Sequence, residues 1–331
     1  MTNPEKNPQL AVLAPGAICT DVEVLEPREV PLGGPRAMTV YRTLPQRQRS
    51  LVGSWCFLDH YGPDDVALTG GMEVPRHPHT GLATVSWLFT GRIDHVDSSG
   101  AAAAVLPGEL NLMIAGQGIT HQEISSPDTT VLHGVQLWYA LPDAMRFSEH
   151  HFAHYAPEPV QLTEATARVF IGELTGSTSP VDTRTPDLLG AELILDPDAE
   201  LTLSVRHDFE HALLAETGGI TVNRTPVSHR ELGYVPVGAD TLHITAGADG
   251  ARVILIGGVP LNEQIVMWWN FVGRTHDEVE EYRRRYQAEL GFEPADPRDA
   301  GKPELFGPYP SGQRAPLPAP TLPTVRLRPR E

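Results

Sequence analysis

Short runs of branched, aliphatic and aromatic residues recur along the chain, and glycine and proline residues separate them. Runs of this length, bounded by turn residues, are typical of β-strands. The expected strands are residues 83–89, 109–115, 134–141, 167–174, 191–196, 201–205, 211–216, 241–246 and 252–258. Because many short strands with few helical periods characterise sandwiches and barrels, the pattern predicts an all-β fold.

One segment, residues 275–291, has the pattern of a helix instead. It opens with Thr275 and has Glu278 three residues later, which is the spacing of a capping box. It closes at Gly291, a residue suited to the position just past a helix end. The sequence therefore predicts one helix over residues 275–290.

The expected strands fall into two groups, and each group repeats strand, glycine-containing turn, strand. This predicts two similar β-barrels in tandem. We expect an N-terminal domain over residues 1–150 and a C-terminal domain over residues 151–293 that includes the helix. Residues 294–331 are rich in proline, which favours an extended or partly disordered tail.

The chain has 331 residues, with 25 Lys and Arg against 42 Asp and Glu, so its formal net charge is −17. An acidic surface repels phosphate backbones and anionic lipids, which disfavours direct binding of nucleic acid or membranes. Cys19 and Cys56 form no CxxC motif, and Cys56 lies in an apolar stretch typical of a buried thiol. No signal peptide and no apolar run long enough to span a membrane is evident, so we expect a cytoplasmic protein.

Two pairs of polar residues stand out against this apolar background. His77 and His79 are one residue apart, and His121 and Glu123 repeat that spacing after Gly116 and Gly118. In a strand, residues i and i+2 point to the same face, so each pair can present two ligand atoms to one metal ion. Together they offer three imidazoles and one carboxylate, a set that suits a divalent first-row metal and leaves positions open for water, oxygen or substrate.

Longer motifs carry a resemblance to a known family. They are FLDHYGP (57–63), HPHTGLATVSWLFTG (77–91), HVDSSG (95–100), LPGELNLMIAGQGITHQE (106–123), LHGVQLWYALP (132–142), VFIGELTGSTSPV (169–181) and GGVPLNEQIVMWWNFV (257–272). In this order they resemble the pirin family, two-domain proteins of the cupin superfamily. The resemblance implies two stacked cupin (jelly-roll) barrels, with one metal in the N-terminal barrel.

The resemblance also implies which residues bind that metal. The family's ligands fall on His77, His79, His121 and Glu123, and the metal is of the iron type. The ligand set suits Fe(II), although Mn, Ni, Cu and Zn bind such sites too. The chain departs from many pirins at Ala83, where they carry a glutamate that is not a ligand, so a second carboxylate near the metal is absent.

Two classes of function follow from the resemblance. Some pirins are quercetin 2,3-dioxygenases, which implies a flavonol or another planar enol as substrate, dioxygen as co-substrate, and Glu123 as both ligand and proton acceptor. Pirins of animals resemble transcription cofactors, which implies instead a metal-dependent regulator acting through a protein partner. The four ligands are common to both classes, and a metal-bearing protein with an unrelated substrate remains a third alternative.

The other histidines are interpreted more simply. His150, His151 and His154 are expected in a solvated loop. The second half offers His207, His211, His229 and His243, none of which forms an i, i+2 pair with another donor histidine, so we expect a structural barrel without metal and one metal per chain. Lone imidazoles are costly to bury, so these four are expected near the surface or hydrogen-bonded to the backbone.

Two further assignments concern residues near the expected site. His95 is expected to support the metal ligands without binding the metal, or Asp97 to fix a turn, and neither is expected to be a ligand. The tryptophans of the apolar strands are expected in the core: Trp87, Trp138, Trp268 and Trp269.

Overall fold

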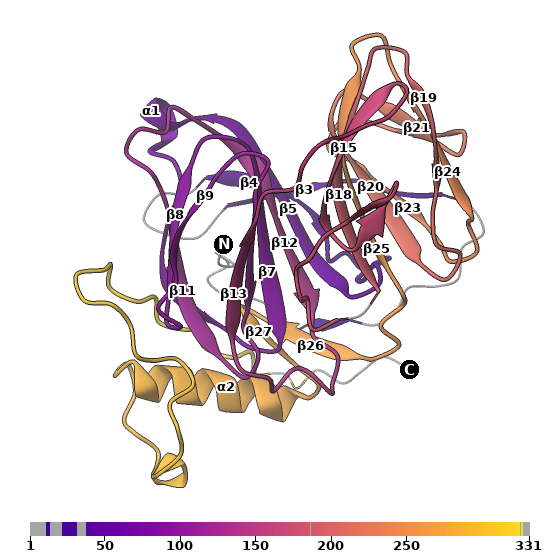
Figure 1. Ribbon diagram of the computed structural model, residues 1–331. Coiled ribbons are helices and arrows are strands. Elements are labelled where there is room, and N and C mark those ends of the chain that lie inside the picture. The colour runs from indigo at the N-terminus through magenta and orange to yellow at the C-terminus, as the bar shows by residue number, and fades with distance from the viewer. Residues whose placement is uncertain (1–10, 14–21, 32–37, 186, 325, 327–331) are drawn as a thin grey trace.

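Two β-domains lie side by side, and one long helix packs beneath the first of them (Figure 1). This computed structural model describes residues 11–13, 22–31, 38–185, 187–324 and 326. Cys19 lies outside the described residues. Strands dominate both domains, which confirms the all-β prediction and its division into two similar units.

The N-terminal domain is built from a seven-stranded and a four-stranded antiparallel sheet. The larger sheet has the order β13 (His151–Tyr155), β10 (Leu110–Ile114), β7 (Leu82–Thr90), β12 (Val131–Ala140), β5 (Trp55–Asp65), β4 (Thr39–Leu44) and β3 (Arg28–Pro31). The smaller sheet has the order β6 (Glu73–His79), β11 (Ile119–Ser125), β8 (Ile93–Asp97) and β9 (Ala102–Val105). A single helical turn, α1 (Val66–Thr69), follows β5.

The C-terminal domain repeats this construction. Its larger sheet has the order β14 (Val160–Gln161), β15 (Ala165–Ile171), β18 (Leu188–Leu195), β25 (Ala251–Gly258), β20 (Glu210–Thr217), β23 (Leu232–Val235) and β2 (Glu23–Leu25). Its smaller sheet has the order β19 (Glu200–Ser204), β24 (Thr241–Ala246), β21 (Ile220–Val222) and β22 (Thr225–Val227). A two-stranded ribbon pairs β16 (Glu173–Leu174) with β17 (Ser177–Thr178).

The burial of each strand explains its sequence pattern. In β24 buried and exposed residues alternate strictly, as expected for a sheet with one face on the core and one in water. In β12 every residue except Val131 is buried, because the larger N-terminal sheet is covered on both faces. The continuous apolar runs of the sequence therefore correspond to the inner strands.

The predicted helix is α2 (His276–Glu289). Its N-cap is Thr275, whose hydroxyl accepts a hydrogen bond from the Glu278 amide. Glu278 does not complete the capping box, because its carboxylate accepts instead from the Arg274 amide and from the Arg146 guanidinium. Gly291 has a φ of 76°, which is the left-handed conformation expected just past a helix end.

The two ends of the chain cross between the domains. Near the start, β2 pairs with β23 and so joins the larger C-terminal sheet. Strand β13 lies beyond residue 150 but pairs with β10 of the N-terminal domain. After the second domain, β26 (Ile265–Trp268) and β27 (Phe271–Gly273) return to the first and form a small sheet with β1 (Ala11–Leu13). Each half of the sequence therefore contributes strands to the sheets of the other.

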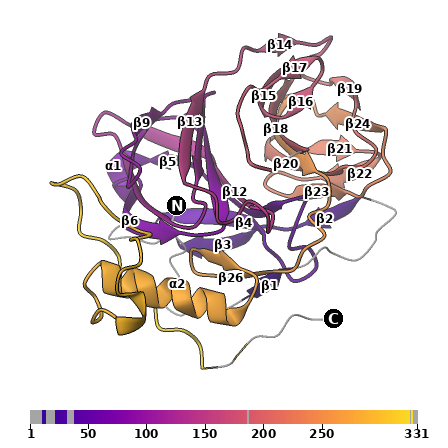
Figure 2. The same cartoon turned by 60° about the horizontal axis from the view of Figure 1, so that its bottom comes forward.

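The proline-rich segment is extended, and it packs against the N-terminal domain (Figure 2). It contains one turn of 3-10 helix, η1 (Pro297–Asp299). The Leu317 amide donates to the carbonyl of Arg76 on β6 at 2.8 Å. Thr120 of β11 donates its hydroxyl to the Phe306 carbonyl at 2.9 Å. The segment therefore covers the outer side of the β6–β11 pair.

One hydrophobic cluster joins the two domains, since it contains Trp55 and Trp87 from the first domain and Phe170 and Ile254 from the second. The Trp55 indole N–H lies 3.1 Å from the carbonyls of both Leu189 and Gly257 across the boundary. No helix among the described residues is long and apolar enough to cross a membrane.

Candidate metal centre

The paired strands β6 and β11 hold the histidines of the two short motifs. His121 lies directly opposite His77, and Ile119 lies opposite His79. The ring centroids of His77 and His121 are 4.3 Å apart, and those of His79 and His121 are 5.0 Å apart. The three rings therefore gather on one side of the strand pair, as the i, i+2 spacing predicts.

The ligand atoms of the three imidazoles converge. One nitrogen from each of His77, His79 and His121 lies within 4.8 Å of the other two, and all three side chains are fully buried. The Nε2 atoms of His79 and His121 are 3.1 Å apart. Two nitrogens bound to one tetrahedral metal at about 2.05 Å lie about 3.3 Å apart. The cluster therefore fits a divalent metal with little rearrangement.

Local contacts aim His77 at the centre of this cluster. Its Nδ1 donates to the Pro75 carbonyl at 2.8 Å, which leaves Nε2 with a free lone pair. That Nε2 is buried and has no hydrogen-bond partner within the described part of the chain. Burial lowers the pKa of His77 to about 3. A neutral imidazole with an unpartnered buried lone pair is what a metal ligand requires.

The other two imidazoles are neutral for similar reasons. Burial lowers the pKa of His79 well below its ordinary value, and the neighbouring His77 lowers it further. Burial and the neighbouring imidazoles of His77 and His79 do the same for His121. At neutral pH all three rings are therefore uncharged, and each has a nitrogen lone pair that can bind a metal.

Glu123 lies two residues beyond His121 on β11. Its carboxylate forms a second group with His121 and His95, whose ligand atoms all lie within 4.8 Å of one another. A register shift in the β6–β11 ladder falls between His121 and Glu123, which faces Val74 rather than the histidine pair. The structure thus brings His77, His79 and His121 together, and it places Glu123 next to His121.

His95 and Asp97 support the cluster from β8. The Nδ1 atoms of His95 and His121 are 3.4 Å apart, and His95 Nε2 lies 3.1 Å from the Asp97 carboxylate. The other oxygen of Asp97 accepts from the amides of Ser99 and Ala101, so it also fixes the turn after β8. Asp97 therefore fixes the turn, as expected, and His95 contacts His121 while its own ring belongs to the group with Glu123.

Three further residues, to which the sequence assigned no role, lie near Glu123. Ser86 Oγ lies 3.0 Å from Glu123 Oε1 and 2.9 Å from the Gln136 side-chain oxygen. Since a hydroxyl has one proton and Gln136 Nε2 is buried without a partner among the described residues, turning the amide over lets Gln136 donate to Ser86 and Ser86 to Glu123. Burial, with the Glu123 carboxylate, raises the pKa of Tyr61 well above its usual range, so its phenol stays protonated.

The apolar wall of the site comes from the core. Trp138 packs edge-on against His79 at 5.0 Å between ring centroids, and it stacks on Phe57 at 4.0 Å. Each of the expected core tryptophans is buried. Cys56 is a buried free thiol, as expected, and burial raises its pKa to about 12.

For the remaining histidines, some of the predictions are confirmed and one is wrong. His207, His229 and His243 are exposed, as expected. His211 is fully buried, and neither of its ring nitrogens has a hydrogen-bond partner in the described chain, so the expectation for it is wrong. It sits on β20 of the larger, two-sided C-terminal sheet, which leaves no solvated face for it.

The segment around His150 also differs from the expectation. His150, His151 and His154 are exposed, but the last two belong to the edge strand β13 rather than to a loop. His154 Nδ1 donates to Asn111 Oδ1 on β10 at 2.7 Å. The strand forms because β10 offers a free edge for pairing.

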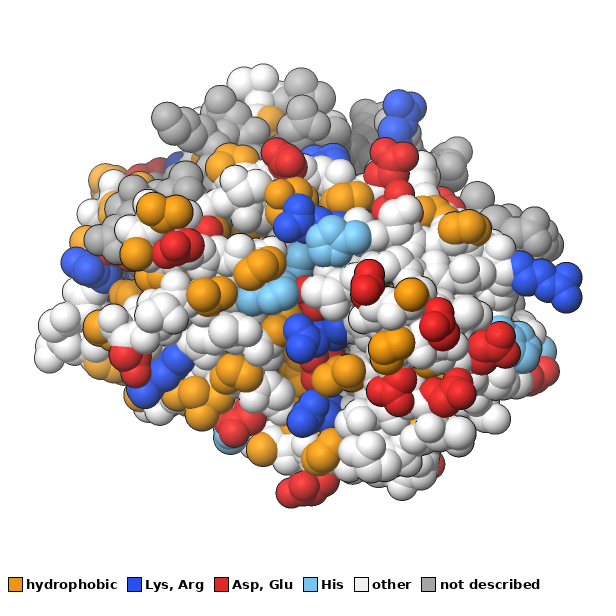
Figure 3. All heavy atoms as spheres, turned by 90° about the horizontal axis from the view of Figure 1, so that it is seen from above, with side chains coloured by type: hydrophobic (Ala, Val, Ile, Leu, Met, Phe, Trp, Pro, Cys, Tyr) orange, Lys and Arg blue, Asp and Glu red, His pale blue; other side chains and the backbone are white. Residues whose placement is uncertain are grey.

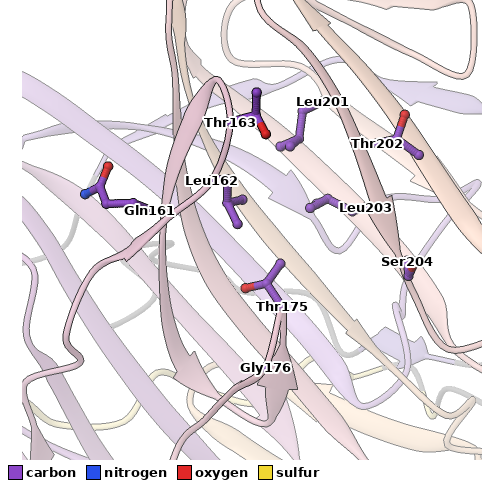
Figure 4. A pocket seen from close by; sticks show the side chains of 9 residues that line it. All are labelled: Gln161, Leu162, Thr163, Thr175, Gly176, Leu201, Thr202, Leu203 and Ser204. Carbon is purple, nitrogen blue, oxygen red and sulfur yellow. The ribbon is translucent and has the colours of Figure 1, made fainter.

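A surface hollow of about 840 Å³ lies in the C-terminal domain (Figure 4). It is lined by Gln161, Leu162, Thr163, Thr175, Gly176, Leu201, Thr202, Leu203 and Ser204. This lining holds no histidine, carboxylate or cysteine, so it offers no metal ligands and is separate from the histidine cluster.

Models of protein families match both domains. The pirin family model matches residues 37–139, and the model of the pirin C-terminal cupin domain matches residues 190–292. The chain belongs to the pirin family. The histidine cluster lies in the N-terminal domain of this pirin, and the matched region of the second domain contains β20 and β25.

Known pirins and related proteins align with most of this chain. It is 39% identical over 282 residues to a Pseudomonas aeruginosa protein named as a candidate quercetin 2,3-dioxygenase, covering 85% of this chain and 86% of that one. A pirin-like protein of Caulobacter vibrioides is 31% identical, covering 75% of this chain and 88% of that one. The crystal structure of a quercetin 2,3-dioxygenase from Acinetobacter baumannii is 34% identical, with a TM-score of 0.83, covering 93% of this chain and 97% of that chain. These matches confirm the two-cupin fold.

Proposed function

We propose that this pirin is a metal-dependent dioxygenase that acts on a flavonol of the quercetin type or on another planar enol. One divalent metal, Fe(II) in the cell, binds to His77, His79, His121 and Glu123. The observation that carries the proposal is the convergence of three buried, neutral imidazoles, two of which have Nε2 atoms 3.1 Å apart. The relatives named for quercetin 2,3-dioxygenase activity supply the substrate class.

The metal supplies Lewis acidity and an electron relay between an enolate and dioxygen. The protein's own residues do the rest. The three imidazoles and Glu123 would hold the metal. Glu123 accepts the proton that the substrate hydroxyl loses when it binds. The hydrogen bond from Ser86 holds the carboxylate in place while it does so.

The surroundings keep the site dry. Trp138 and the buried ligands exclude bulk water from one side, and the protonated phenol of Tyr61 lies near the Glu123 carboxylate. A dry site strengthens each of these electrostatic interactions and protects a reactive enolate from protonation by solvent.

The test is turnover of quercetin by protein reconstituted anaerobically with Fe(II) and then exposed to air. We expect loss of the flavonol absorbance with consumption of oxygen. Glu123→Gln retains an oxygen ligand but cannot accept a proton, so kcat should fall about 100-fold or more while part of the metal stays bound.

The regulatory alternative predicts a different result. A fully loaded protein that turns over no flavonol, and that captures a protein partner only when metal is bound, would overturn the dioxygenase proposal. The metal content of each preparation must be measured beside activity, so that an empty site is not mistaken for an inactive one.

A further inference from the structure

A second group of metal-ligand residues lies at the boundary between the two domains. His60 on β5 and His133 on β12 come from the N-terminal domain, and Glu216 on β20 comes from the C-terminal domain. Their ligand atoms all lie within 4.8 Å of one another. His60 and Glu216 are fully buried, and His133 is 6% exposed. None of the three belongs to the two i, i+2 pairs of the first centre, His77 with His79 and His121 with Glu123.

The contacts in this group are as close as those of the first centre. The Nε2 atoms of His60 and His133 are 3.2 Å apart, against 3.1 Å for His79 and His121. Glu216 Oε1 lies 2.6 Å from His133 Nε2 and 3.4 Å from His60 Nε2. Ligand atoms around one tetrahedral metal lie about 3.3 Å apart, so small side-chain movements accommodate an ion among them.

Hydrogen bonds leave this group incompletely satisfied. Glu216 Oε1 is buried and has no hydrogen-bond partner within the described part of the chain, although it lies 2.6 Å from His133 Nε2 and 3.4 Å from His60 Nε2. The nitrogens are therefore close to the carboxylate without the geometry of a hydrogen bond. A cation among the three atoms makes all three contacts favourable.

Irregularities in three ladders aim these side chains at the boundary. The pairing of β12 shifts register at His133 against both β5 and β7. The pairing of β20 with β25 shifts between Ala215 and Thr217, which makes Glu216 the extra residue of a bulge. Bulges redirect single side chains and are common beside functional sites. Two such features face each other here across the domain boundary.

Charged neighbours orient the carboxylate. Arg252 Nη1 lies 3.3 Å from Glu216 Oε2, so the other oxygen, Oε1, is the one directed at the imidazoles. Burial alone would raise the pKa of Glu216, but contacts with His133 and His60 lower it to about 2, so the carboxylate is ionised. Burial lowers the pKa of His60, which keeps that ring neutral.

The cluster lies close to the surface, since His133 is 6% exposed. Figure 3 shows histidine side chains near the middle of one face of the molecule, with Lys or Arg side chains beside them. His229 is exposed, and its ring centroid lies 6.3 Å from that of His60. An ion can therefore approach the cluster from outside.

We propose that His60, His133 and Glu216 form a second metal site, which binds a divalent transition metal such as Zn²⁺ and ties the two domains together. Two histidines and one glutamate are a known zinc ligand set, and three protein ligands leave one position for water. The site is independent of the dioxygenase proposal, because it shares no residue with the first centre.

The experiment counts metal equivalents bound by the full chain without a histidine tag. Metal-free protein is loaded with Zn²⁺, desalted and analysed. We expect two equivalents for the wild type, one for His77→Ala/His79→Ala, one for Glu216→Gln and one for His133→Gln. His211→Gln is the matched control, since it changes another buried histidine on β20, and it should keep two.

A spectroscopic measurement guards against variants that fold poorly. Co²⁺ bound to the His77→Ala/His79→Ala variant should give the visible bands of a four-coordinate nitrogen and oxygen site, and adding Glu216→Gln to that variant should remove them. If the wild type binds one equivalent, or if His77→Ala/His79→Ala binds none, the proposal is wrong. Retention of two equivalents by both Glu216→Gln and His133→Gln would also overturn it.

Discussion

At the scale of single residues, the Ser86 hydroxyl lies 3.0 Å from the Glu123 carboxylate and supports it. Removing such a partner from a metal ligand typically lowers metal affinity 10- to 100-fold. We expect Ser86→Ala to weaken Fe(II) or Zn²⁺ binding at the first centre by about that factor, measured by competition with a chelating dye. Ser179→Ala, which removes a buried hydroxyl from the C-terminal domain, should leave the affinity unchanged. Equal affinities for Ser86→Ala and wild type would mean that Glu123 needs no support from Ser86.

His121 and His151 provide a second comparison between a buried and an exposed imidazole. His121 faces both His77 and His79, whereas His151 projects from an edge strand into solvent. His121→Ala should lose most of the metal of the first centre, and His151→Ala should lose none of it. Elemental analysis of both variants checks this, and equal metal loss would show that the wrong cluster has been identified.

His211 makes stability depend on pH. Burial lowers its pKa from 6.5 to about 4, so between these values the unfolded chain binds a proton that the folded chain does not. Its contribution to stability is complete above pH 6.5 and is lost as pH falls toward about 4, by about 3 kcal/mol in total. Denaturant unfolding of metal-free wild type and His211→Gln at pH 7 and near pH 4.5 should show a smaller acid loss in the variant. The same loss in both proteins would assign the pH dependence to other groups.

The residue scale also shows what the sequence can reveal about sites. His77 with His79, and His121 with Glu123, are local pairs, and a strand translates their spacing directly into a shared face. His60, His133 and Glu216 are far apart in the sequence, and only the packing of three strands from two domains brings them together. Ser86 and Gln136 meet Glu123 for the same non-local reason. No pattern along the chain could have placed them there.

At the scale of elements, hydrophobic runs predicted some inner strands, such as β7, β12 and β25, but missed others, such as β5 and β11. The expected strand at residues 241–246 coincides with β24, whose alternation is strict. The edge strand β13 was expected to be a loop, because it follows Pro142 and its histidines suggest a segment exposed to solvent. Edge strands depend on a partner's free hydrogen bonds rather than on their own apolar residues, so a single sequence shows them weakly.

The packing of α2 and the tail against the first domain is testable through Phe306. This side chain is fully buried beside Phe271 and Tyr286, and its carbonyl accepts from Thr120 next to the histidine cluster. Phe306→Ala should destabilise the protein by about 3–5 kcal/mol. Phe292→Ala is the control, because that ring is 38% exposed, and it should cost far less. Denaturant unfolding measures both, and a small effect at Phe306 would mean that the tail contributes little to the fold.

At the scale of the whole molecule, the two domains share part of their apolar core. One large cluster contains residues of both domains, although another lies in the C-terminal domain, and β26 and β27 return from the second domain to cover Trp138 in the first. Strand β2 crosses in the opposite direction. Family models divide the chain into two matched regions, but packing and chain crossing bind those regions into one unit.

This interleaving predicts that the protein unfolds as one unit. Either domain exposes the shared cluster if it unfolds alone, and that cost should make partly folded states sparse despite the length of the chain. Metal-free protein should show one calorimetric transition, and tryptophan fluorescence and circular dichroism should report the same midpoint. Gly53 offers a probe of the boundary: its φ is 55°, a Cβ there would lie 2.8 Å from the Cα of Gly258, and its amide donates to Glu210. Gly53→Ala should therefore lower the midpoint of the single transition. Two separate transitions in the wild type, with only one of them shifted in Gly53→Ala, would show that the domains are energetically independent.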